Sequence, residues 1–305
     1  MKVGFIGCGV YALTLSKIFR KNNCNITMWS KFEDEISNLK SKYDYIKFTN
    51  NLKEISNSDL IVVAIPSSFI IDTINKFKQY YNNNEILIAS KGILNNGTFI
   101  SETIEKILNT TKISVISGPT FAIDIDSNIP LGLSLGSNHK SSINLIKKVL
   151  ETDYLKLEII NDVIGIEFCG SIKNVIAISC GMIEGLKYPE STRYKYLTNI
   201  IKELYEIIPQ IGGKKETINS YAGIGDLLLT STSTKSRNYS LGIVLGKGED
   251  YIKYTEKNTT EGYYTLLSLY KLLQSKNINM NMINILYSII YEKNNINEFI
   301  ELLKS

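Results

Sequence analysis

Five short apolar runs in the first 120 residues constrain the fold more than any other feature of this 305-residue chain. They lie at residues 3–6, 26–29, 60–65, 86–89 and 113–116, and stretches with helical spacing separate them. Because each run is apolar at nearly every position, both faces of each strand should be buried, as in a largely parallel sheet. The alternation predicts a doubly wound, Rossmann-like α/β domain.

The second half of the chain has a different pattern. Its apolar residues recur at helical spacing over long segments, at residues 164–186, 194–211, 260–274 and 282–291. We therefore expect a dinucleotide-binding domain over residues 1–160 and an all-helical substrate or catalytic domain over residues 161–305.

Composition narrows the class of protein. Hydrophobic residues make up 44% and charged residues 21%, which is typical of globular domains. The net charge of +4 suits a small anionic substrate and does not call for nucleic acid. The four cysteines form no C-x-x-C pair, and His139 is the only histidine. We therefore expect no metal site, a reducing compartment, and a general base other than histidine.

No segment has the pattern of a targeting or membrane-spanning sequence. Residues 2–7 already have the pattern of a buried strand, and the most apolar long segment carries Glu167, Lys173 and Glu184. Charges near the centre of a spanning helix are rare, so we expect no membrane insertion and a cytoplasmic location.

A glycine-rich motif follows the first expected strand. Gly7-Cys8-Gly9-Val10-Tyr11-Ala12 matches G-x-G-x-x-A, and a helix is expected to begin within it. In this context glycines let the backbone approach a pyrophosphate, and the N–H groups of the helix N-terminus face the phosphates. A tight turn without a ligand is the alternative. We predict dinucleotide binding.

The choice between NAD and NADP depends on the end of the second strand. It reads Trp29-Ser30-Lys31, without the acidic residue that would hold a ribose 2′-hydroxyl. Ser30 and Lys31 suit a 2′-phosphate, whereas Glu33 and Asp34 nearby leave NAD open. NADP(H) is slightly favoured, although Lys31 has the alternative of a solvated lysine.

Lys173 interrupts a segment that is apolar almost all round. Burial lowers the pKa of a lysine, which lets it exchange a proton near neutral pH. The alternatives are that its amine reaches the surface or pairs with Glu167. Other polar clusters follow expected strands or interrupt apolar runs: Ser90-Lys91-Gly92, Ser117-Gly118-Pro119-Thr120, Asp226 and Ser236-Arg237-Asn238. Ordinary alternatives are a turn at Gly118, a salt bridge at Asp226 and a helix cap at Ser236.

Taken in order, these motifs resemble the soluble, bacterial-type NAD(P)-dependent glycerol-3-phosphate dehydrogenases. Gly118-Pro119-Thr120-Phe121-Ala122, Lys173-Asn174, Gly223-Ile224-Gly225-Asp226 and Glu261-Gly262 add to the likeness, which spans most of the chain. The resemblance implies interconversion of dihydroxyacetone phosphate and sn-glycerol 3-phosphate, a role in supplying glycerophospholipid synthesis, and a homodimer.

The resemblance also implies the site residues. Lys173 would be the proton donor or acceptor at the C2 oxygen of the substrate, with Lys91 and Asp226 completing the catalytic set. The implied substrate-binding residues are Lys91, Gly118, Thr120, Lys173, Asp226, Ser236, Arg237 and Asn238. The implied cofactor-binding residues are Gly7, Gly9, Val10, Tyr11, Ser30, Lys31, Lys91, Ala122, Arg237 and Glu261.

The sequence departs from the family pattern at four places, and two rival functions remain. Val10-Tyr11 stands where members often carry Ser-Trp, and Ala12 where many carry glycine. Thr120 replaces a usual serine but keeps its hydroxyl, and the region after Glu261 is short and asparagine-rich. The rivals are a dehydrogenase of 3-hydroxy acids or sugar acids and a non-catalytic dinucleotide sensor. Ser236-Arg237-Asn238 argues against the first rival, and Lys173 with Asp226 argues against the second.

Overall fold

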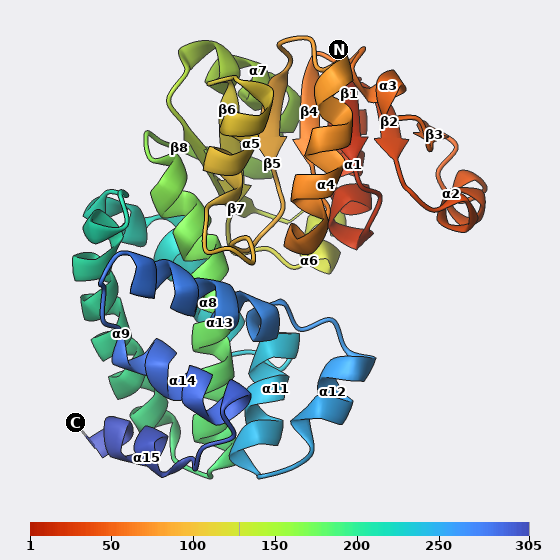
Figure 1. Cartoon of the computed structure of the whole chain (residues 1–305). Helices are drawn as coiled ribbons and strands as arrows, with labels where there is room; N and C mark the ends of the chain where they lie inside the picture. The colour runs from red at the N-terminus through yellow and green to blue at the C-terminus, as the bar shows by residue number, and fades with distance from the viewer. Residues whose placement is uncertain (128, 305) are drawn as a thin grey trace. The chain divides into compact units, whose positions relative to one another are not determined.

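The chain folds into two compact units (Figure 1). The computed structural model describes residues 1–127 and 129–304. The first unit comprises Met1–Lys91 and Ile100–Val163, and the second comprises Gly92–Phe99 and the chain from Ile164 onward. The short segment 92–99 belongs with the second unit because Ile93 and Phe99 are buried in its core.

The first unit is built on an eight-stranded sheet in the order β3-β2-β1-β4-β5-β6-β7-β8. All strand pairs are parallel except β6 with β7. The expected largely parallel sheet is therefore confirmed. The strands are β1 Lys2–Ile6, β2 Asn25–Trp29, β3 Ile46–Thr49, β4 Leu60–Val63, β5 Glu85–Ile88, β6 Ile113–Ser117, β7 Leu131–Ser137 and β8 Leu155–Ile160.

The strand order places the end of β1 at the position where such sheets bind ligands. β1 pairs with β2 on one side and with β4 on the other, and residues 3–6 are fully buried between them. From β1 the chain proceeds outward to β2 and β3, then returns to β4 on the opposite side. Ligands of open α/β sheets bind beyond the carboxyl ends of the strands at this reversal.

Helices connect the strands of the first unit. They are α1 Val10–Lys21, α2 Glu33–Lys40, α3 Leu52–Ile55, α4 Ser67–Phe77, α5 Ile100–Leu108, α6 Ala122–Asp126 and α7 Lys140–Leu150, with a 3₁₀ turn η1 Lys78–Tyr80. The apolar face of α1 packs on the sheet, where Phe19 meets Phe5 edge to face with ring centroids 5.5 Å apart. This packing fixes the direction in which the N-terminus of α1 points.

The second unit is helical, and its other helices surround one central helix, α8 (Figure 1). Its helices are α8 Val163–Gly185, α9 Glu190–Gln210, α10 Asp226–Ser231, α11 Arg237–Gly246, α12 Tyr251–Lys257, α13 Glu261–Ser275, α14 Asn281–Tyr291 and α15 Asn297–Lys304, with short turns η2 Lys215–Asn219 and η3 Tyr221–Gly225. The expected helix-rich second half is confirmed.

Helix α8 is apolar on every side because it lies inside this unit. By length and composition it could cross a membrane, but 89% of its most apolar window is buried within the structure. A helix that is hydrophobic all round is accommodated either in a core or in a membrane, and here the other helices cover it. Any polar side chain on α8 must therefore find its partner inside the protein.

Candidate active site

The glycine turn after β1 has the geometry of a phosphate cradle. Gly7 has φ +116°, and a Cβ there would lie 2.5 Å from the carbonyl oxygen of Ala64, so only glycine fits. A Cβ on Gly9 would meet nothing within 4 Å, which leaves its backbone open to a ligand. The turn therefore fits the pyrophosphate of a dinucleotide.

The first turn of α1 leaves its positive end available. Gly9 is the N-cap and provides no side-chain cap, and no acidic residue lies in the first turn. The N–H groups there can therefore face an anion. Val10 is 72% exposed, while Tyr11 is half-buried.

The predicted residues beyond β5 and β6 lie at the same edge of the sheet. Lys91 follows β5 and is half-buried, and Gly118 directly follows β6 and is buried. A Cβ on Gly118 would lie 3.0 Å from the carbonyl oxygen of Gly132, so a side chain is excluded. The Oγ1 atom of Thr120 is buried and has no hydrogen-bond partner among the residues that the structure describes, although buried hydroxyls are nearly always paired. Ala122 begins α6, but its side chain lies outside the described residues.

In the second unit, α8 and α10 bring a lysine and an aspartate together inside the core. Lys173 is 6% exposed and Asp226 is 1% exposed. The Nζ atom of Lys173 forms an ion pair with Oδ1 of Asp226. A small cavity beside Lys173 is otherwise lined by the apolar residues Cys169, Ile172, Ile176, Leu204, Ile218, Gly223 and Leu227. The surrounding low dielectric strengthens the ion pair and penalises either charge alone.

A single turn of π-helix sets the position of Asp226. In η3, the hydroxyl of Ser220 accepts a hydrogen bond of 3.0 Å from the N–H of Gly223. A Cβ on Gly223 would lie 2.1 Å from the carbonyl oxygen of Ile218, so this tight turn requires glycine. Asp226 begins α10 immediately after the turn, and its backbone carbonyl accepts from Thr230. Such π turns frequently occur at functional sites.

The predicted cluster 236–238 forms the start of α11. Ser236 is the N-cap, and its hydroxyl accepts from the N–H of Tyr239. The helix-cap alternative therefore describes what this hydroxyl does here. Arg237 is exposed, so its guanidinium is available to an anion. Asn238 is buried, and its Oδ1 atom accepts from the N–H of Gly262 at 2.9 Å.

Helices α8, α11 and α13 meet beside Lys173. Asn174 donates to Glu261 over 3.4 Å, and a Cβ on Gly262 would lie 2.6 Å from the carbonyl oxygen of Asn174. Together with the bond from Asn238, these contacts attach the N-terminus of α13 to both other helices. The structure thus gathers the predicted residues 173, 226, 236–238 and 261 in the second unit, and the other predicted residues in the first.

Family models match nearly the whole chain. The model described as the NAD-dependent glycerol-3-phosphate dehydrogenase N-terminus matches residues 2–143, and the corresponding C-terminus model matches residues 162–301. The chain belongs to the NAD-dependent glycerol-3-phosphate dehydrogenase family. It is therefore an oxidoreductase of an NAD(P)-dependent family, as the motifs indicated.

Individual members of the glycerol-3-phosphate dehydrogenase family agree in sequence and fold. The chain is 30% identical to the glycerol-3-phosphate dehydrogenase [NAD(P)+] of Staphylococcus aureus, over 98% of this chain and 96% of the relative. It is 29% identical to that of Staphylococcus haemolyticus over the same shares. The crystal structure of glycerol-3-phosphate dehydrogenase from Coxiella burnetii superimposes with a TM-score of 0.93 and 26% identity, covering 100% of this chain and 99% of that one.

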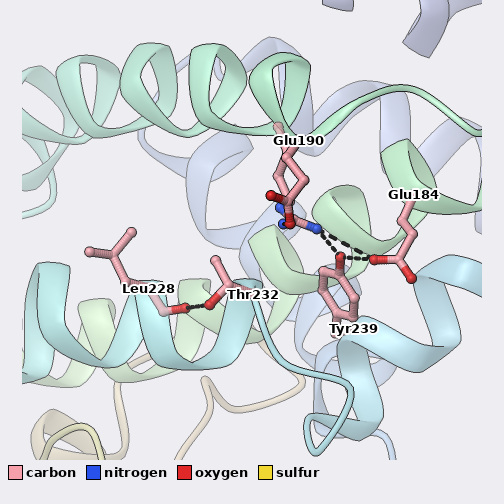
Figure 2. A network of polar contacts seen from close by, with 6 residues as sticks. Glu184, Glu190, Leu228, Thr232 and Tyr239 are labelled. Atoms are coloured by element: carbon pink, nitrogen blue, oxygen red, sulfur yellow. Dashed lines mark hydrogen bonds and ion pairs between the residues drawn. The ribbon is translucent and has the colours of Figure 1, made fainter.

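A polar network that the sequence analysis of this glycerol-3-phosphate dehydrogenase family member did not predict links α11 to α8 and α9 (Figure 2). Arg193 of α9 is 6% exposed and contacts Glu184 of α8, Glu190 of α9 and the hydroxyl of Tyr239 in α11. Figure 2 shows the Tyr239 hydroxyl turned toward Glu184, to which it donates. Burial and then the Glu184 carboxylate raise the pKa of Tyr239. In the same view Thr232 donates to the carbonyl of Leu228 at the end of α10.

This network positions α11. Tyr239 follows Asn238 directly, so holding its ring holds the turn that carries Arg237. Sequence reasoning missed Arg193 because an arginine in a polar helix is ordinarily solvated. The signal available in the sequence was the helical spacing. At that spacing Arg193 lies on the same face of α9 as the buried residues Tyr196, Leu197, Ile200 and Leu204.

Proposed function

We propose that this chain interconverts dihydroxyacetone phosphate and sn-glycerol 3-phosphate with NAD(P)H or NAD(P)+. The family membership supports the activity, and the buried ion pair between Lys173 and Asp226 is the observation that carries the mechanism. An ammonium group held in an apolar core is costly, so its retention favours a chemical role.

Lys173 is assigned the proton transfer at the C2 oxygen. When bound, the nicotinamide dinucleotide supplies the hydride for reduction and accepts it in oxidation. During reduction negative charge develops on the carbonyl oxygen, and the ammonium of Lys173 stabilises this charge and then delivers its proton there. Asp226 orients the amine through their ion pair. Lys91 is assigned a second, electrostatic contribution at the same oxygen.

The remaining substrate contacts are assigned by their chemistry. The exposed guanidinium of Arg237 is assigned the phosphate, because its fork can donate two parallel hydrogen bonds. Gripping a group remote from C2 supplies orientation for the reaction. The hydroxyl of Thr120 is buried without a partner in the described part of the chain, which supports its assignment to the ligand. Gly118, Ser236 and Asn238 complete the proposed substrate set.

The dinucleotide is assigned to the first unit. Gly7 and Gly9 would receive the pyrophosphate against the N-terminus of α1, and the open space above Gly9 supports this. The further proposed cofactor contacts are Val10, Tyr11, Ser30, Lys31, Lys91, Ala122, Arg237 and Glu261. These roles make residues 1–160 the proposed dinucleotide-binding part and residues 161–305 the proposed substrate part.

The cellular role follows from the product. We propose that the enzyme is a cytoplasmic homodimer that supplies sn-glycerol 3-phosphate to glycerophospholipid synthesis. The four free cysteines, all buried, suit a reducing compartment. Light scattering of the purified protein tests the dimer.

Oxidation of NADH and of NADPH, followed separately at 340 nm in the presence of dihydroxyacetone phosphate, tests the activity. We expect turnover with this ketone and a kcat/KM roughly ten- to hundredfold lower with unphosphorylated dihydroxyacetone, the effect of losing a charged hydrogen-bonding group. Equal rates with both ketones would refute the phosphate contact. Tight binding of a dinucleotide without oxidation by any phosphorylated ketone would favour the sensor instead.

A further inference from the structure

Glu35, which the sequence analysis did not single out, is held close to the end of β2. Ser30 directly follows β2 and is 4% exposed. Its hydroxyl donates to the Oε2 atom of Glu35, in the first turn of α2. The same hydroxyl accepts from the N–H of Phe32 at 3.2 Å, and the N–H of Ser30 donates to Thr49 of β3. Ser30 is thereby fixed on two sides, and it fixes the carboxylate of Glu35.

This carboxylate also lies against the glycine turn. Trp29 at the end of β2 is paired in register with Ile6 at the end of β1, so the two strand ends are neighbours. Cys8, between the two glycines of the turn, is 3% exposed. Burial, and after it the hydrogen bond and charge of Glu35, raise the pKa of the Cys8 thiol to about 12. Glu35 is therefore within reach of the turn that would receive the pyrophosphate.

The charge around this position is negative. The first turn of α2 carries Glu33, Asp34 and Glu35, whereas Lys31 is the only cation between β2 and α2. Lys31 is exposed, and Glu33 accepts a hydrogen bond from Asn50 at 2.7 Å. One solvated ammonium group does not neutralise three carboxylates.

We infer that Glu35 selects NAD(H) over NADP(H) by accepting hydrogen bonds from the adenosine ribose and repelling a 2′-phosphate. A carboxylate has about four acceptor positions, so Glu35 can hold Ser30 and still accept from a ribose hydroxyl. A 2′-phosphate carries a charge of about −1.5 to −2 at pH 7 and would meet a fixed like charge. This inference rests on the proposed dinucleotide site, and it reverses the preference that Ser30 and Lys31 suggested from the sequence.

Equilibrium binding without substrate tests the inference. Dissociation constants are measured by calorimetry for NADH and NADPH, and for ADP-ribose with and without a 2′-phosphate. We expect the unmodified protein to bind NADH at least tenfold more tightly than NADPH. In Glu35→Gln the ratio should fall about tenfold, chiefly because NADPH binds better. Ser30→Ala, which releases Glu35, should shift the ratio in the same direction by less.

Glu33→Gln is the matched control, because it removes one charge from the same helical turn while Glu35 stays in place. Its ratio should remain within about twofold of that of the unmodified protein. Preference for NADPH, or an unchanged ratio in Glu35→Gln, would overturn the inference while leaving the proposed reaction intact. Failure of either dinucleotide to bind would overturn both. Retained selectivity in a protein that does not reduce dihydroxyacetone phosphate would support Glu35 and remove the proposed substrate.

Discussion

At the scale of single residues, the molecule is organised around one ammonium group in an apolar core. Lys173 can be buried, with an exposed fraction of 6%, because Asp226 lies beside it. Asp226 lies there because Gly223 permits the preceding π turn. Removing one member of such a pair leaves an uncompensated charge, which costs about 3–5 kcal/mol. The arrangement therefore depends on two segments far apart in the sequence, α8 with Lys173 and the turn from Gly223 to Asp226.

Replacing the amine should abolish most of the turnover. In Lys173→Met we expect kcat with dihydroxyacetone phosphate to fall by about a hundredfold or more, the scale of lost general acid–base catalysis. Dinucleotide binding, measured by calorimetry, should remain. This binding is the control that the first unit of the variant is folded. Lys202→Met, at an exposed position of α9, is the control and should retain full activity. Near-normal turnover in Lys173→Met would remove this lysine from the mechanism.

We expect that lysine cannot replace Arg237, although it carries the same charge. In Arg237→Lys we expect kcat/KM for dihydroxyacetone phosphate to fall about tenfold, because a point charge cannot reproduce the bidentate fork. Steady-state kinetics measures this directly. Lys235→Ala removes an exposed cation two residues before Arg237, outside α11, and should change kcat/KM little. Identical kinetics for Arg237→Lys and the unmodified protein would contradict the phosphate role.

At the scale of elements, helices α8 and α11 pack so closely that their backbones are in contact. Helix α8 carries Lys173, and α11 begins at Arg237. Gly181 and Gly185 of α8 face Gly242 and Gly246 of α11. A Cβ on Gly181 would lie 2.0 Å from the carbonyl oxygen of Tyr239, and one on Gly242 would lie 2.0 Å from that of Ile178. Arg193 of α9 contacts both helices through Glu184 and Tyr239. Glycine spacing and a polar clamp together fix α8 against α11.

A methyl group in this contact should destabilise the second unit. In Gly181→Ala the backbones must separate, and we expect a loss of about 3 kcal/mol of unfolding free energy, as for overpacked cores. Alanine is intrinsically the better helix former by about 1 kcal/mol, so the sign of the change identifies the clash. Urea denaturation measures it. Ser240→Ala, on the partly exposed side of α11, should lose no more than about 1 kcal/mol. Stability equal to or above that of the unmodified protein would refute the close contact.

At the scale of the whole molecule, each unit has its own core, and each core contains a thiol that is kept protonated. Burial raises the pKa of Cys8 in the first unit and of Cys180 in the second from 9.0 to about 12. An unfolded thiol ionises near 9.0, so between these values the unfolded chain binds fewer protons than the folded one. These two thiols therefore leave the unfolding free energy unchanged below about pH 9 and lower it as the pH rises further.

The loss of unfolding free energy at alkaline pH should be smaller when a buried thiol is removed. Between pH 8 and pH 10.5 the Cys180 thiol should account for about 2 kcal/mol of lost unfolding free energy, at about 1.4 kcal/mol per pH unit. Cys180→Ala should lose that much less over the same interval, measured by urea denaturation with a reductant present. Ile176→Val, a neighbouring apolar change on α8 without a titratable group, should keep the original slope. A slope that Cys180→Ala leaves unchanged would contradict the raised pKa.

Local patterns in the sequence correctly predicted much of the fold. The five apolar runs are strands, the glycine motif is the turn after β1, and the long periodic segments are helices. Strands β3, β7 and β8 were not foreseen. β3 has only four residues, β7 contains Gly132 and Gly136, and β8 lies at the edge of the sheet and is buried only at Leu155 and Leu157. Their hydrogen bonds come from neighbouring strands, which a local window does not contain.

Tertiary structure alone decided which polar groups meet. The apolar pattern around Lys173 favoured burial of this lysine but left open a surface position or a pair with Glu167, and only the fold showed that it is buried and that Asp226 is its partner. The fold also brought Glu35 beside the glycine turn. The physical reason is range. Backbone geometry and hydrophobic periodicity act over a few residues and are written along the chain, whereas an ion pair or a ribose site depends on distances between segments that only packing brings together.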